Sequence, residues 1–97
     1  MEHNIGESIK IARKMRGFTQ SELGKKINIG KDHISRIETN QTNASMETMK
    51  KISKALQIPI AYILLLGINE KSFPKKYRYR FTIAQETINQ IVKEIYN

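Results

Sequence analysis

Cysteine and tryptophan are absent from this chain of 97 residues. The lack of cysteine excludes disulfides, thiolate catalysis and cysteine-ligated zinc. Only two prolines occur, Pro59 and Pro74, and no stretch alternates polar and apolar side chains as a strand does. The longest apolar run, 60–66, is far below the roughly 20 residues that a membrane span needs. The sequence therefore predicts an all-α protein and no membrane partner.

Acidic residues are scarce, since nine Asp and Glu stand against 17 Lys and Arg, a formal net charge of +8. A positive field raises the encounter rate with a polyanion such as nucleic acid or an acidic membrane surface. A basic surface that only keeps the protein in solution explains this charge equally well. The start, MEHNIGESIK, is polar and carries no apolar secretory segment, so a cytoplasmic location is expected.

The histidines, serines and carboxylates of the chain are not spaced as in catalytic or metal-binding motifs. His3 and His33 stand alone, and neither a Ser/His/Asp arrangement nor a pair of catalytic carboxylates is visible. We therefore expect no enzymatic activity, no cofactor and no metal site.

Start and stop signals divide residues 5–67 into five short helices. Asn4 with Glu7 and Thr19 with Glu22 each pair an N-cap side chain with an acid three positions on. Gly17 suits the end of the first helix. The first expected helix begins after Asn4, and the second runs from Gln20 to about Lys26. The third runs from Gly30 to Glu38 or Thr39. The fourth begins at its cap, Ser45, and the fifth runs from Pro59 to Gly67.

Apolar side chains recur at helical spacing in these segments and predict the core. The fifth helix is apolar nearly all round, so we expect neighbours on both sides of it. Gly24 costs its helix about 1 kcal/mol relative to alanine, which predicts a closely packed neighbouring helix. The apolar stripes of the first and fourth helices are Ile5, Ile9, Ala12 and Met15, and Met46, Met49, Ile52, Ala55 and Leu56.

The second and third helices, joined by a short break, have the spacing of a helix-turn-helix. Ile34 and Ile37 form a narrow apolar seam on the third helix. The opposite arc carries long polar side chains, which suit contacts with base edges in a DNA major groove. These side chains are Lys31, Asp32, Ser35 and Arg36.

Residues 5 to 64 resemble the XRE/Cro-type helix-turn-helix family, the five-helix DNA-binding domain of lambdoid phage repressors. The resemblance rests on IGESIKIARKMRGFTQSELGKKINIGKDHISRIE, SMETMKKISKAL and IPIAYIL. It implies a DNA-binding domain over 1–67 and a sequence-specific regulator of transcription, most often a repressor. Two positions depart from the family pattern: Gly30 replaces the usual Ser or Thr cap, and Ala44 replaces a common proline.

The resemblance also implies roles for single residues. Lys31, Asp32 and Arg36 would contact bases with Ser35 beside them, and Asp32 would accept from a cytosine amino group or orient Lys31 or Arg36. A buried ion pair between Arg13 and Glu38 would be structural. His33 either touches a phosphate or is packed or solvated. The residues expected along the DNA backbone are Thr19, Gln20, Gly30, His33, Asn40, Gln41 and Asn43.

Residues 68–97 lie beyond this resemblance. INEKS has the composition of a polar linker, and Pro74 suits the first position of a helix that would end near Tyr96. Apolar residues recur there at alternating spacings of three and four, the a/d pattern of a paired helix. Such a seam folds back on the fifth helix or pairs with a second copy, and we favour a homodimer on a palindromic operator. The seam residues are Tyr77, Phe81, Ala84, Ile88, Ile91 and Ile95.

A second hypothesis assigns this C-terminal segment to another protein. In an antitoxin-like autorepressor, the N-terminal domain binds DNA and the C-terminal segment covers a partner protein. Such a segment would be disordered when free, and this property distinguishes the two hypotheses.

Overall fold

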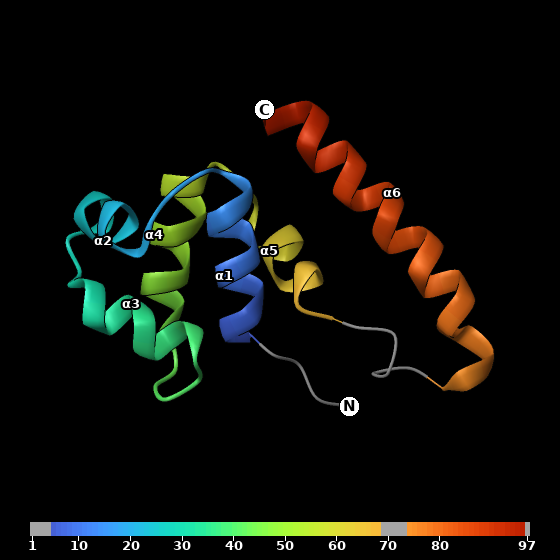
Figure 1. Ribbon diagram of the computed structural model, residues 1–97, viewed down its shortest axis with the longest axis horizontal. Coiled ribbons are helices and arrows are strands. Elements are labelled where there is room, and N and C mark those ends of the chain that lie inside the picture. The colour runs from blue at the N-terminus through green and yellow to red at the C-terminus, as the bar shows by residue number, and fades with distance from the viewer. Residues whose placement is uncertain (1–4, 69–73, 97) are drawn as a thin grey trace.

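The computed structural model describes residues 5–68 and 74–96, and within them it is helical without strands (Figure 1). The all-α prediction is therefore confirmed, while the Asn4 cap and most of the INEKS segment lie outside the described residues. The helices are α1 (Ile5–Met15), α2 (Gln20–Ile27), α3 (Lys31–Glu38), α4 (Met46–Leu56), α5 (Ile60–Leu66), a 3-10 turn η2 (Lys75–Tyr77) and α6 (Arg78–Tyr96).

Left-handed residues follow four of these helices, α1 to α4. Gly17 has φ +76° after α1, where a side chain would be strained. Asn40 has φ 62° after α3, and the next amide, Gln41 N–H, donates to the Arg36 carbonyl at 2.8 Å. Asparagine tolerates this backbone region better than most residues, so it takes the place of glycine there.

The core lies among α1 to α5. Within the described residues, no α6 side chain is among its fully buried members, although Ile88 packs against the edge. Ile5 and Met46 are 41% and 63% exposed, so their predicted place in the core is wrong. Each is the first residue of its helix, and its side chain projects toward the helix N-terminus, beyond the neighbouring helices. The buried apolar residues are Ile9, Ala12, Leu23, Ile27, Ile34, Ile37, Met49, Ile52, Leu56, Ile58, Ile63 and Leu66.

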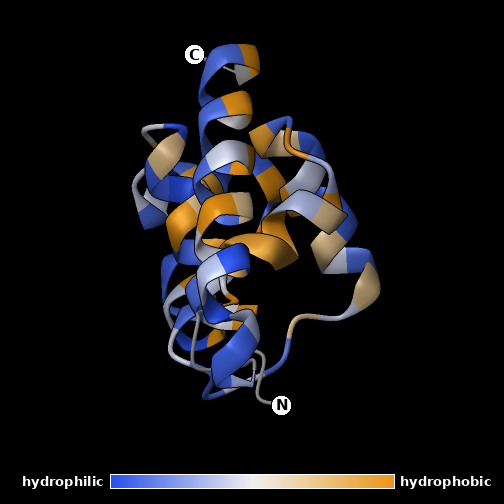
Figure 2. Cartoon of the chain, turned by 90° about the vertical axis from the view of Figure 1, so that its right-hand side faces the viewer, coloured by the Kyte–Doolittle hydropathy of each residue, from blue (hydrophilic) through white to orange (hydrophobic). Residues whose placement is uncertain are grey.

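The arrangement places α2 and α3 on one side of the central helices and α6 on the other (Figure 1). Along α6, hydrophobic segments return on one side over successive turns (Figure 2). The neighbour of α6 is α5, which buries Ile63 and Leu66 but leaves Tyr62 38% exposed. The prediction that α5 is covered on both sides is therefore only partly right, because α6 crosses just part of its outer surface.

A buried ion pair connects α1 to the end of α3, as the resemblance implied. Arg13 Nε lies 2.6 Å from Glu38 Oε2, and Arg13 Nη2 lies 3.0 Å from Glu38 Oε1. The third guanidinium nitrogen donates to the Phe18 carbonyl at 2.6 Å. Both charged residues are nearly inaccessible, at 6% and 4% exposure. This bidentate geometry satisfies charges that would be costly to bury alone.

We predict that Arg13→Ala lowers the free energy of unfolding by roughly 3–5 kcal/mol, because it leaves a buried carboxylate without its cation. Lys14→Ala, an exposed change on the same helix, is the control and should cost less than about 1 kcal/mol. Urea denaturation followed by circular dichroism measures both. Equal stability of the two variants would show that the pair contributes nothing beyond a surface charge.

Candidate nucleic-acid interface

The turn between α2 and α3 is built on close backbone contact. Asn28 adopts the left-handed conformation (φ 59°, ψ 44°), and Ile29 N–H donates to the Gly24 carbonyl at 2.8 Å. A Cβ on Gly24 would collide with the Ile29 carbonyl oxygen. The neighbour that requires glycine is thus the turn that follows α2, and the expectation of a packed neighbouring helix is wrong.

A capping box fixes the start of α2. Thr19 Oγ1 accepts from Glu22 N–H at 3.0 Å, and Thr19 N–H donates to Glu22 Oε1 at 2.9 Å. The backbone hydrogen bond from Thr19 lowers the pKa of the Glu22 carboxyl, and the Thr19 side chain and the charge of Lys25 act in the same direction. A lowered folded-state pKa means that this stabilisation is present above the ordinary carboxyl pKa and is lost as the pH falls through the folded-state value.

Helix α3 has the two faces that the sequence predicted. Ile34 and Ile37 are buried, at 1% and 2% exposure. Lys31, Asp32 and Arg36 are exposed on the remaining surface. Of the two other predicted contact residues on this helix, Ser35 and His33 are half-buried.

Gln20, predicted to reach a phosphate, also takes part in the buried ion pair. Its Nε2 donates to Glu38 Oε1 at 3.1 Å and so joins the first residue of α2 to the last residue of α3. The hydrogen bond between Gln20 and Glu38 could not be predicted from the sequence, because the two residues are 18 positions apart and share no local pattern.

The loop after α3 contains three of the predicted backbone contacts. Asn40 Oδ1 accepts from Gly6 N–H at 3.2 Å, so the side chain of Asn40 fixes the first turn of α1. A Cβ on Gly6 would lie 2.5 Å from the Ile37 carbonyl oxygen, which shows how closely α1 and α3 meet there. Gln41 and Asn43 are exposed at the tip.

Two further polar residues near the turn, Ser21 and Lys25, were not among the predicted contacts with DNA. They lie one helical turn apart on α2 and line a shallow hollow at the turn together with Gly30 and Lys31. Their position beside the turn could have been predicted from their spacing of four residues, because this spacing places both side chains on the same surface of α2. Lys25 thus adds positive charge next to the start of α3.

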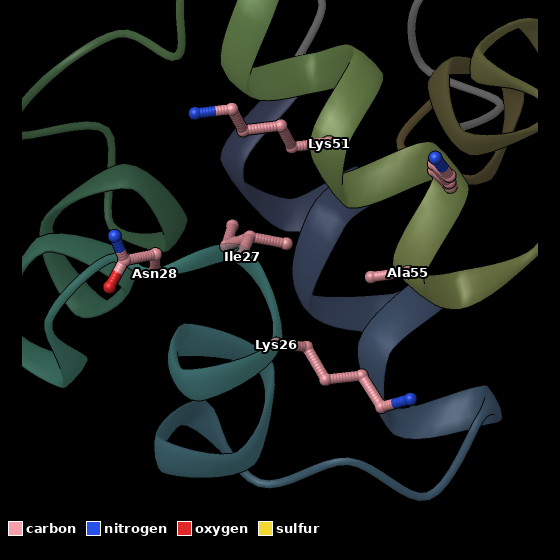
Figure 3. A pocket seen from close by; sticks show the side chains of 6 residues that line it. Lys26, Ile27, Asn28, Lys51 and Ala55 are labelled. Atoms are coloured by element: carbon pink, nitrogen blue, oxygen red, sulfur yellow. The ribbon is translucent and has the colours of Figure 1, made fainter.

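A second basic surface lies in the hollow between α2 and α4 (Figure 3). Lys26 of α2 and Lys51 of α4 line it, with Ile27 between them and their ammonium ends pointing in opposite directions, and Lys54 lines it as well. Lys51 is 3.8 Å from Glu47, but both side chains are at least half exposed, so this pair contributes little. Three lysines therefore border this hollow.

The described residues contain no cluster of three His, Cys, Asp or Glu side chains that would hold a metal ion. In the described part of the chain, no helix combines the length and apolarity that crossing a membrane requires.

A short helix with a buried apolar seam, held by a fixed turn behind a capped helix, defines a helix-turn-helix domain. The family model described as Helix-turn-helix matches residues 9–63. The chain belongs to this family, in its XRE-type branch.

Relatives extend the likeness beyond the motif. The chain is 29% identical over 92 residues to the HTH-type transcriptional regulator ImmR of Bacillus subtilis, covering 95% of this chain and 68% of that protein. It is 39% identical over 61 residues to SinR of B. subtilis, covering 62% of this chain and 55% of that regulator. It is also 39% identical over 54 residues to antitoxin HipB of Escherichia coli, covering 56% of this chain and 61% of the antitoxin.

Solved structures agree with this assignment. The N-terminal DNA-binding domain of SinR superimposes with a TM-score of 0.58 and 36% identity, over 65% of this chain and 93% of that one. The clp gene regulator ClgR of Corynebacterium glutamicum has a TM-score of 0.64 over 97% of this chain and 92% of its own, at 18% identity, so it supports the fold alone.

We predict that Gly24→Ala destabilises the domain. Overpacking against the Ile29 carbonyl costs about 1–3 kcal/mol, whereas the gain in helix propensity is at most about 1 kcal/mol. Gly30→Ser is the control, since a Cβ at Gly30 meets open space and serine is a better N-cap. Thermal melting should fall for the first variant and stay level or rise for the second. A Gly24→Ala protein that melts above the parent would contradict the close contact.

Proposed function

We propose that the protein is a sequence-specific, double-stranded DNA-binding transcriptional regulator that acts as a repressor by occupying its operator. The observation that carries the proposal is α3, a helix with a buried seam at Ile34 and Ile37 and exposed Lys31, Asp32 and Arg36. The membership in the helix-turn-helix family and the names of the related regulators support it.

In this proposal, α3 enters the major groove, which is about 12 Å wide. Arg36 and Lys31 donate to guanine edges, Asp32 accepts from a cytosine amino group, and Ser35 contributes a hydroxyl on the same arc. A side chain that reads bases gives sequence preference, since only base edges differ from one site to another.

Flanking groups hold the DNA backbone. Thr19 and Gln20 at the start of α2, and the loop with Asn40, Gln41 and Asn43, provide the outer contacts. Gly30 caps α3 without a side-chain hydrogen bond, so the first amides of the helix stay available to a phosphate. His33 remains a candidate phosphate contact from the same turn.

A homodimer on a palindromic operator completes the proposal. Two recognition helices about 34 Å apart read successive major grooves on one side of the duplex. Tyr77, at the end of η2, is 44% exposed, and Ile91 and Ile95 of α6 are 44% and 61% exposed. Apolar side chains repeated along one side of a helical segment favour association.

In the antitoxin-like alternative, the same domain binds DNA, but α6 binds a different protein instead of a second copy of this chain. Its support is the 39% identity to HipB. The described α6 is an ordered helix of 19 residues, which favours a preformed dimer element over a segment that folds only on its partner.

The test begins with selection of bound sequences from a random duplex pool. If a dimer engages roughly 6–10 phosphates, affinity for the selected sequence should fall about 10³–10⁵-fold between 50 and 200 mM salt. Absence of an enriched sequence, or a flat response to salt, would exclude the DNA-binding proposal.

Within that assay, we predict that Lys31→Ala and Arg36→Ala each cost roughly 1–3 kcal/mol on the selected site and relax preference at one base position. Gln20→Ala should weaken selected and random DNA alike, because phosphate contacts carry no sequence information. Lys54→Ala, which removes the same charge from the α2–α4 hollow, is the control. An Arg36→Ala variant that loses equally on both DNAs would contradict base reading by Arg36.

We also predict that the chain sediments as a dimer at tens of micromolar and that Ile91→Lys shifts it to monomer, because a charge then replaces an apolar contact. Gln90→Lys places the same charge on an exposed neighbouring position and should leave the dimer intact. A monomeric parent protein that still binds its selected site fully would remove α6 as the dimer element.

A further inference from the structure

The start of α6 carries a dense group of positive charges that the proposed contacts with DNA do not use. Four of the 17 Lys and Arg lie within the six residues 75–80, and no acidic residue occurs from 74 to 85. Aromatic residues alternate with these cations, since residues 75–81 read KKYRYRF. The α6 basic surface, as we call it, consists of the exposed side chains of Lys75, Lys76, Tyr79 and Arg80.

The α6 basic surface faces away from the domain on which α6 packs. Phe81, Gln85 and Ile88 line a hollow of about 140 Å³ at the end of α5. Gln85 Nε2 donates to the Ile68 carbonyl there, at 2.9 Å. Tyr79 precedes Phe81 by two residues, a rotation of about 200° around the helix axis, and it is 77% exposed. The surface therefore stays accessible while α6 is held against α5.

The fold provides no counter-charge for these cations. Neither of the ion pairs within residues 5–68 and 74–96 includes a side chain of the α6 basic surface. The Lys76 ammonium lies 4.9 Å from the centre of the Tyr77 ring, an exposed contact that leaves its charge in solvent. Positive charge at the start of a helix opposes the helix dipole, so the cations do not stabilise α6 either. A polyanionic partner would supply the missing counter-charge.

The position of this surface indicates which polyanion binds there. The start of α6 and the loop after α3 both lie at the lower end of the molecule in Figure 1. That loop contains Asn40, Gln41 and Asn43, the proposed contacts with the DNA backbone. Figure 2 shows the lower end of α6 as predominantly hydrophilic. The longest dimension of the molecule is 43 Å, which about 13 base pairs match at about 3.4 Å each. A duplex bound at α3 is thus long enough to reach the start of α6.

We propose that the α6 basic surface binds the phosphate backbone of the same duplex that α3 reads, away from the bases that α3 contacts. This inference rests on the proposed function. Lysine, arginine and tyrosine side chains all donate to phosphate oxygens. Lys76 and Arg80 supply charge, and the Tyr79 hydroxyl supplies a neutral donor between them. Because phosphates are the same at every base pair, these contacts add affinity on any sequence and leave base preference to α3.

The test compares two double variants of the full-length chain that lose the same charge. Lys76→Gln with Arg80→Gln removes two cations from the α6 basic surface. Lys54→Gln with Lys93→Gln, the control, removes two exposed cations elsewhere. Lys93 lies on α6 itself, about 20 Å beyond Arg80 along the helix axis. The probes are the duplex obtained by selection and a random duplex of equal length, each titrated between about 50 and 200 mM salt.

The Lys76→Gln, Arg80→Gln variant should bind both probes roughly tenfold more weakly per lost phosphate contact at about 100 mM salt. The slope of log K against log salt should become shallower by about 1.8 per chain, and by half of that for Arg80→Gln alone. Base preference should not change. Ethylation interference, which detects single phosphates, should lose the positions that this surface contacts. The control should keep the slope and the interference pattern of the parent.

An unchanged slope in the Lys76→Gln, Arg80→Gln variant would overturn the inference. Equal losses in the two double variants would overturn it as well, because they would reflect net charge alone. The same holds if the variant loses binding to vesicles that contain phosphatidylserine and keeps its affinity for DNA, a result that would assign the surface to a membrane. In each case a selected sequence still bound by the parent leaves the proposed function standing, whereas the absence of any selected sequence overturns both.

Discussion

The carboxylate of Glu38 is the point on which the position of the recognition helix depends. Arg13 binds it from α1 through two nitrogens, and Gln20 binds it from the first residue of α2. Arg13 also donates to the Phe18 carbonyl in the connection between those helices. One buried anion at the last residue of α3 therefore fixes three segments at once. Because all these donors converge on it, α3 cannot rotate about its apolar seam without leaving charge unpaired.

Backbone contacts without side chains supply the second constraint. Gly24 allows the turn carbonyl of Ile29 to lie against α2, and Gly6 allows the end of α3 to lie against α1. The Gly24 contact acts at the start of α3, whereas the Gly6 contact acts at its end, beside the cluster around Glu38. The helix is thus held at its start by the turn and at its end by the ion pair. In the proposed complex with DNA, the backbone between those points would need no further ordering, which lowers the entropic cost of binding.

Local signals carried most of the prediction of the fold. The Thr19–Glu22 box and the glycine after α1 set helix ends through residues a few positions apart, and the structure has the same ends to within one or two residues. The predicted burial of Ile34 and Ile37 is confirmed for the same reason. Contacts between distant residues could not be predicted in this way. The engagement of Asn40 with Gly6 and the contact of Gln85 with Ile68 depend on how whole helices are placed, which periodicity does not describe.

In the proposed function, the attachment of α6 to α5 determines how two DNA-binding domains are joined. A short recognition helix reads few base pairs, so specificity of the usual size requires two half-sites. Their spacing is fixed only if the two domains are rigidly joined. Gln85 and Ile88 hold α6 against the end of α5 and the core. Further along α6, the apolar side chains of Ile91 and Ile95 stay exposed. In the proposed dimer, the same helix that is anchored to its own domain by these residues pairs with its copy through the remaining surface. The distance between the two α3 helices of that proposed dimer would then depend on the α5–α6 contact as much as on the dimer interface, so a change at Gln85 would alter the preferred operator spacing without removing a contact with DNA.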